Sequence, residues 1–317
     1  MNITNPFECP YDLYQRYSLT AQVIEQLDEV FGKAAPILEV GGDAGVLQSF
    51  LPQESLTIVN FQPTVGRGII PADGCQLPFK DKIFRGVVAL DVLEHIPHDK
   101  RHVFLHEIDR VTSDWLVIGG PFNHEIVRDA EAIILDYYKH LTGLSHSYLE
   151  EHKQQGLPDR GTILDYLHSL GGHTIVIPNG LIWRWMLVMG MTMFLQKEPS
   201  DSELIGKVYD FLNRNLAPLD NLEPAYRHII VCSRIPLPVD IGALVSTTES
   251  RHHLDRNWEE ATAALQTLMA DKIRQRDERI SQLEGQIHIL QKFQDQVQAT
   301  LPYRIYRQWK RLWKGSK

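Results

Sequence analysis

Short apolar runs alternate with a helical pattern along the chain, and this alternation predicts its architecture. A helix-periodic segment at 11–31 precedes the first run, and a second helix is predicted at about 98–111. The apolar runs are typical of buried strands and lie at 37–40, 56–61, 68–73, 87–90, 115–122, 173–178 and 226–233. Strands that alternate with helices indicate an α/β fold built on a largely parallel sheet.

The first predicted strand ends in a glycine-rich turn, Gly41-Gly42-Asp43-Ala44-Gly45, which leads into an apolar helix start. A dinucleotide fingerprint is not matched, because Asp43 and Val46 stand at its second and third glycine positions. Glu39 in the strand and Asp43 in the turn suit a cofactor with positive charge and no phosphate, such as S-adenosylmethionine (SAM). Many α/β proteins have such a turn, so a purely structural role is the alternative.

The next predicted strands end in polar residues that would gather at one edge of the sheet. Asn60 and Phe61 close the second strand, and Asp73-Gly74 follows the third. The fourth leads into Asp91-Val92-Leu93-Glu94-His95-Ile96-Pro97. Ligands of open α/β sheets bind beyond the carboxyl ends of the strands, so this segment is expected near the reacting group.

Residues 36–122 resemble class I SAM-dependent methyltransferases through the glycine turn, Asp73-Gly74 before Leu77-Pro78-Phe79, and the Asp91 to Pro97 segment. The resemblance implies a Rossmann-like seven-stranded sheet whose last two strands form an antiparallel edge. It also implies that Gly41 and Gly45 line the methionine part of SAM, Asn60 the ribose and Asp73 the adenine. The full set of candidate cofactor-binding residues is Glu39, Gly41, Gly42, Gly45, Asn60, Phe61, Asp73, Gly74 and Asp91.

Methyl transfer to a hydroxyl needs a group that removes the hydroxyl proton, and two histidines are candidates. His95 follows the fourth strand and is the first choice, whereas His124 follows the fifth strand and is the second. A general base of this kind contributes about 10²- to 10⁴-fold to a rate.

Residues at about 123–172 and 180–216 are predicted to form a helical acceptor cap on a domain that spans 1–235. This region is similar to bacterial methyltransferases found with glycosyltransferases in surface-polysaccharide biosynthesis. The resemblance implies a glycan or lipid-linked saccharide acceptor. The alternatives are a small-molecule or lipid acceptor, or an inactive methyltransferase-like scaffold, which the departures Asp43 and Asn60 favour.

Composition places the protein among ordinary globular chains, with 317 residues and a net charge of −8. Its three cysteines, Cys9, Cys75 and Cys232, are too far apart for a metal-ligand pair, and no metal site is predicted. The N-terminus has no signal-peptide pattern, and the most apolar window, 181–195, is shorter than the ~20 residues of a membrane span. A cytoplasmic protein is expected, either free or peripheral on the inner membrane.

The pattern changes after a Pro/Gly/Ser-rich linker at 236–252. A coiled coil is predicted at 253–300, with Ile273, Ile280 and Ile287 at one seam position and Met269, Leu283, Leu290 and Val297 at the other. Two parallel strands are favoured, with three strands or a single helix folded onto the catalytic domain as alternatives. The basic tail at 301–317, with six Lys or Arg and two Trp, predicts binding to an anionic membrane surface rather than to nucleic acid.

Overall fold

The computed structural model describes residues 5–42, 45–61, 68–197, 202–237, 244, 274–275, 277–292 and 295–296. The chain divides into two compact units, Met1–Asn257 and Trp258–Lys317. The predictions for Asp43, for nearly all of the linker and for the basic tail at 301–317 therefore lie outside the described residues.

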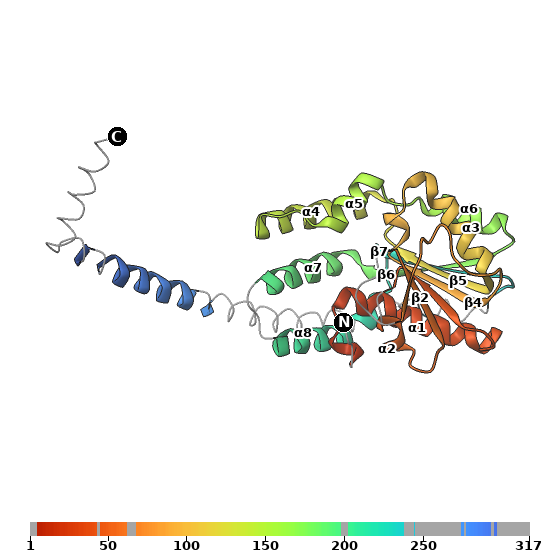
Figure 1. The fold of residues 1–317 in the computed structure, drawn as a ribbon, viewed down its shortest axis with the longest axis horizontal. Helices are drawn as coiled ribbons and strands as arrows, with labels where there is room; N and C mark the ends of the chain where they lie inside the picture. The colour runs from red at the N-terminus through yellow and green to blue at the C-terminus, as the bar shows by residue number, and fades with distance from the viewer. Residues whose placement is uncertain are drawn as a thin grey trace, which may run out of the picture. The chain divides into compact units, whose positions relative to one another are not determined.

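A seven-stranded sheet forms the centre of the first unit, in the order β3-β2-β1-β4-β5-β7-β6 (Figure 1). The strands are β1 (Ile37–Val40), β2 (Leu56–Asn60), β3 (Ile69–Pro71), β4 (Phe84–Leu90), β5 (Thr112–Gly120), β6 (His173–Leu181) and β7 (Ala225–Ser233). β1 to β5 pair in parallel, whereas β7 is antiparallel to both β5 and β6. This is the Rossmann-like sheet of class I methyltransferases, so the predicted fold is confirmed. One detail differs, because β6 runs parallel to β5 and only β7 is reversed.

Helices cover both faces of this sheet, which explains why the strand sequences are largely apolar. In β4 every residue is buried: Val87 and Ala89 pack toward α3 (Arg101–Val111) and α6 (Arg160–Ser169). Val88 and Leu90 pack toward α1 (Tyr11–Phe31) and α2 (Val46–Phe50) on the opposite face. Parallel strands buried on two sides have no solvent face that would accept polar residues.

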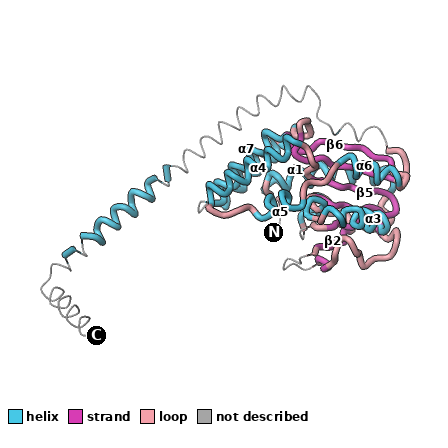
Figure 2. Tube along the Cα trace, turned by 90° about the horizontal axis from the view of Figure 1, so that it is seen from above, coloured by secondary structure: helices cyan, strands magenta, loops and turns pink. Residues whose placement is uncertain are grey.

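The remaining helices are α4 (Glu125–Thr142), α5 (Ser147–Gln155), α7 (Ile182–Lys197) and α8 (Ser202–Asn215), with short 3₁₀ turns at η1 (Pro6–Glu8), η2 (Leu93–His95), η3 (His98–Lys100) and η4 (Ala217–Leu219). The helices α4, α5 and α7 share a separate apolar core that includes Trp185 and Tyr226. α4 and α7 lie side by side in both views (Figure 1 and Figure 2). None of the helices in the described part of the chain has the length and apolar character needed to cross a membrane.

The second unit is described only at 274–275, 277–292 and 295–296, and these residues are helical. Four residues of the predicted seam fall within them, Ile280, Leu283, Ile287 and Leu290, and all four are exposed. The other seam positions lie outside the described residues. A coiled coil therefore stays a prediction.

Candidate active site

The turn after β1 exposes Gly41 and buries Gly42. Gly41 has φ +79°, and its amide donates to the Val59 carbonyl at 2.8 Å. A Cβ at Gly41 would lie 2.4 Å from Cγ2 of Val92, and one at Gly42 would lie 2.2 Å from the carboxyl carbon of Glu39. The missing Cβ atoms at these two positions make room for the Val92 and Glu39 side chains, which pack directly against the turn.

Two side chains, Glu39 of β1 and Asn60 of β2, pack against this turn or bond to it. The carboxylate of Glu39 is buried and accepts a hydrogen bond from the Tyr17 hydroxyl at 3.0 Å. The Asn60 amide at the end of β2 donates to the carbonyl oxygens of Gly41 at 3.3 Å and Gly42 at 3.2 Å. An acid at position 60 could not donate these bonds. Asn60 therefore positions the turn, a role that the sequence pattern did not predict.

The turn after β3 is held by Asp73. This residue is exposed, and its Oδ1 accepts a hydrogen bond from the Cys75 amide at 2.8 Å. A Cβ at Gly74 would lie 2.8 Å from the Phe104 ring, so the turn packs directly on α3. Phe61 beyond β2 is 73% exposed and thus offers an apolar face to solvent.

Asp91 at the end of β4 belongs to a cluster of charges at the base of the site. It has φ +50°, and its carboxylate accepts from Nη1 of Arg16 at 2.5 Å and from Nε of Arg227 at 2.7 Å. Both arginines also pair with Asp12 of α1. Burial raises the pKa of Asp91, but Arg16 and Arg227 outweigh this effect and lower it to about 2. Asp91 thus ties β4 to α1 and β7.

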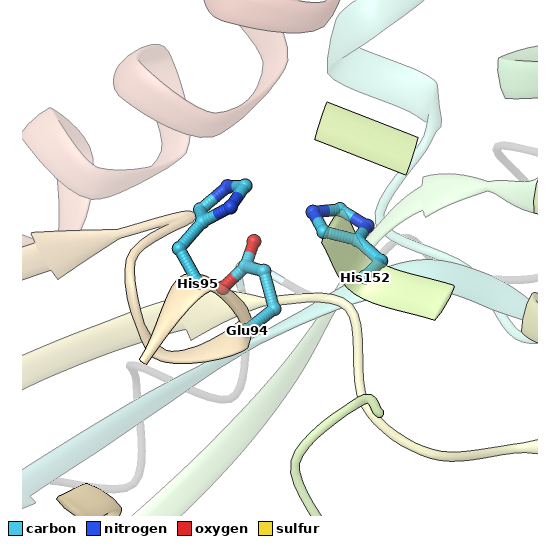
Figure 3. A group of neighbouring side chains, drawn as sticks. All are labelled: Glu94, His95 and His152. Carbon is cyan, nitrogen blue, oxygen red and sulfur yellow. The ribbon is translucent and has the colours of Figure 1, made fainter. Parts of the chain in front are cut away.

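Three side chains meet directly beyond Asp91: Glu94 and His95 from η2, and His152 from α5 (Figure 3). One polar atom of each lies within 4.8 Å of the others. Glu94 is 1% exposed, and neither of its carboxylate oxygens has a hydrogen-bond partner among the described residues. Buried polar groups normally have partners, so these atoms indicate a binding site.

Carboxylates hold both imidazole rings of this cluster. Nδ1 of His95 lies 2.9 Å from Oε2 of Glu151, and Nδ1 of His152 lies 2.8 Å from Oε1 of Glu131. Burial, followed by the nearby His152, lowers the pKa of His95 below its ordinary value. Burial, followed by the negative Asp91, raises the pKa of Glu94 well above its ordinary value.

His124, the second candidate base, lies elsewhere. It is exposed at the N-cap of α4, its side chain makes no capping hydrogen bond, and it is not part of the Glu94–His95–His152 cluster. Sequence reasoning placed His95 at the site but missed His152. The only signal was the acidic run before His152, Glu150-Glu151, which is equally typical of a solvated helix.

Part of the chain is similar to a known protein family. Residues 51–114 match a family model described as a methyltransferase domain. No curated protein matches the sequence significantly. The family match covers the part of the sheet that runs from β2 to the start of β5.

Solved structures with a similar fold share little sequence with this chain. A SAM-dependent methyltransferase from Thermotoga maritima is 12% identical with a TM-score of 0.41, covering 71% of this chain and 93% of its own. Magnesium protoporphyrin IX methyltransferase from Synechocystis is 13% identical with a TM-score of 0.38, covering 69% and 83%. Phosphoethanolamine N-methyltransferase 2 from Haemonchus contortus is 15% identical with a TM-score of 0.38, covering 68% and 52%. The substrates in these names belong to those proteins.

Proposed function

We propose that this chain is a SAM-dependent O-methyltransferase whose acceptor is a sugar hydroxyl of a bacterial surface glycan or its lipid-linked precursor. The observation that carries the hydroxyl assignment is the Glu94–His95–His152 cluster, which brings two buried and one half-buried proton-binding group to the carboxyl end of β4. That is the edge where the ligand of an α/β sheet binds.

The residues around β1 and β3 fit the cofactor. Gly41 is exposed in the turn after β1, so its backbone can contact the methionine part of SAM. Asp73 is exposed and can accept a hydrogen bond from the adenine amino group. Bound SAM supplies an electrophilic methyl group. The chain's own task is to orient the acceptor oxygen in line with that methyl and to activate it.

Exposed apolar side chains on the cap helices support a lipid-linked acceptor. Ile133 and Tyr137 of α4, and Trp183 and Leu187 of α7, are all exposed. Each pair is spaced by four residues and so forms a stripe on its helix. The basic segment at 301–317, with its two tryptophans, supports the same acceptor because it suits an anionic membrane surface.

Calorimetric titration with SAM and with its demethylated product, S-adenosylhomocysteine, tests this function first. We expect binding in the micromolar range, weakened by Asp73→Ala. Loss of one hydrogen bond to a charged group costs about 1.5–3 kcal/mol, or about 10- to 100-fold in affinity. Asp81→Ala is the matched control, because Asp81 is an exposed surface residue that pairs with Arg110.

The acceptor is then tested by transfer of a labelled methyl group to a lipid-linked saccharide and to the same saccharide without lipid. Faster transfer to the lipid-linked form supports the proposal, and transfer only to the free form contradicts its lipid part. Failure of both cofactor ligands to bind would overturn the enzyme assignment. A methyltransferase-like scaffold in glycan assembly would then take its place.

We also propose that the chain self-associates through the helix of its second unit. Leu283 and Ile287 are exposed at predicted seam positions, so Leu283→Asp with Ile287→Asp should turn a dimer into a monomer in sedimentation velocity. Ser281 lies outside the predicted seam, so Ser281→Asp should leave the dimer intact. A wild-type chain that sediments as a monomer at micromolar concentration would contradict the proposal.

A further inference from the structure

We propose that Glu94, His95 and His152 bind a divalent transition-metal ion, such as Zn²⁺ or Mn²⁺. The sequence predicted no metal, since these residues come from η2 and from α5, two segments far apart in the chain. In the folded chain their polar atoms lie within 4.8 Å of one another, which is the spacing that a shared ion requires (Figure 3).

Unpartnered buried atoms point to the ligand. Both carboxylate oxygens of Glu94 and Nε2 of His152 are buried and have no hydrogen-bond partner in the described part of the chain. A carboxylate that is 1% exposed and has no partner is costly in a folded protein. A bound cation would compensate the carboxylate and the imidazole nitrogen at the same time.

The surroundings of the two histidines are those of metal ligands. Glu151 engages Nδ1 of His95 and Glu131 engages Nδ1 of His152, at 2.9 and 2.8 Å. Such bonds fix the tautomer that carries the Nδ1 proton, which leaves Nε2 as the ligating nitrogen. Glu131 is itself held by the Tyr226 hydroxyl at 2.8 Å. The residues that hold the two histidines are therefore themselves held in place.

The donor set restricts the choice of ion. Two imidazoles with one carboxylate are typical of catalytic zinc and of other first-row divalent ions, and these sites keep an open position. Asp91 follows the same strand but is not a ligand of the proposed ion, because Arg16 and Arg227 already neutralise its carboxylate. The three ligands supply one negative charge, so the ion retains net positive charge toward a fourth ligand.

The open position is suited to an acceptor hydroxyl, a role that rests on the proposed function. A hydroxyl at the ion loses its proton to solvent water more readily, as water does on bound zinc. Its oxygen then forms the C–O bond with the methyl carbon while the carbon–sulfur bond breaks, and the electron pair of that bond neutralises the sulfonium. With the ion in place, His95 is a ligand rather than the general base.

Calorimetric titration of the chelator-treated full chain with Zn²⁺ and with Mn²⁺ tests the site without any substrate. We expect one equivalent of at least one ion to bind, with a loss of about 100-fold or more for Glu94→Gln and for His152→Ala. Glu131→Gln should give a smaller loss of about 10- to 100-fold, because outer-shell partners contribute that much. X-ray absorption of the zinc form should show two imidazole nitrogens at about 2.0–2.1 Å.

His140→Ala is the matched control, since this histidine is exposed on α4 and should not affect the site. Binding that Glu94→Gln and His152→Ala leave unchanged, or no stoichiometric binding, would overturn the metal site. Binding of SAM by each variant verifies the fold and separates the two proposals. Metal binding without SAM binding contradicts the methyltransferase, whereas SAM binding without metal binding contradicts only the metal site and returns His95 to the role of base.

Discussion

Replacing Gly41 by alanine is expected to weaken SAM binding by about 30- to 100-fold. The new Cβ would lie 2.4 Å from Cγ2 of Val92, at a residue with φ +79°. Relief requires the Val92 side chain or the turn itself to shift, and the turn is where we propose that the backbone contacts SAM. The loss of two hydrogen bonds between this backbone and SAM, at about 1–1.5 kcal/mol each, accounts for that loss of affinity. Calorimetric titration with SAM measures it.

Gly143→Ala separates the effect of the clash from that of the backbone angle. Gly143 ends α4 with φ +74°, and a Cβ there would have no neighbour within 4 Å. This variant should lose about 1 kcal/mol of stability through the left-handed conformation and retain its SAM affinity. Equal SAM affinities of the two variants would show that the turn after β1 is not the cofactor site.

Apolar patterning located the strands because parallel strands covered on both faces must be apolar along their length. It failed where a buried charge belongs to a strand. The run at 87–90 predicted too short a strand, since β4 begins at Phe84 and contains Arg85. That side chain is buried and pairs with Asp28 and Glu54, so its charge is satisfied inside the fold. A pattern rule assigns such a charge to a loop.

The part of the candidate site that lies at the end of a strand could be predicted from the sequence. Glu94 and His95 follow β4, so the rule for the carboxyl ends of strands placed them correctly at that edge. His152 comes from α5, whose position depends on contacts across the fold, such as the bond to Glu131. No local pattern encodes such a contact, which explains why the cluster emerged only in three dimensions.

Asp220 is a second case in which a buried polar residue controls the fold beside the site. Its side chain is fully buried and accepts hydrogen bonds from Tyr11 and Gln15 of α1 and from Arg184 of α7. Its main-chain carbonyl accepts from the amides of residues 180 and 181, both at 3.1 Å. One residue therefore joins α1 and α7 to the end of β6.

Asp220→Ala should lower the free energy of unfolding by about 3–5 kcal/mol, because it removes the carboxylate that pairs with a buried arginine. Burial raises the pKa of Asp220 to about 7 against the effect of Arg184, so the measurement belongs at pH 8, where the carboxylate is mostly ionised. Urea unfolding followed by circular dichroism gives the change as a shift in midpoint at constant slope.

Asp210→Ala is the matched control for this prediction. Asp210 also pairs with an arginine, Arg214, at 3.0 Å, but the two side chains are 34% and 50% exposed. An exposed helical pair of this kind contributes about 0.3–0.5 kcal/mol, so the control should unfold close to the wild type. Similar losses of unfolding free energy in both variants would mean that the buried Asp220–Arg184 pair stabilises the fold no more than an exposed pair does. A large loss confined to Asp220→Ala would show that the junction of α1, β6 and α7 depends on this one carboxylate.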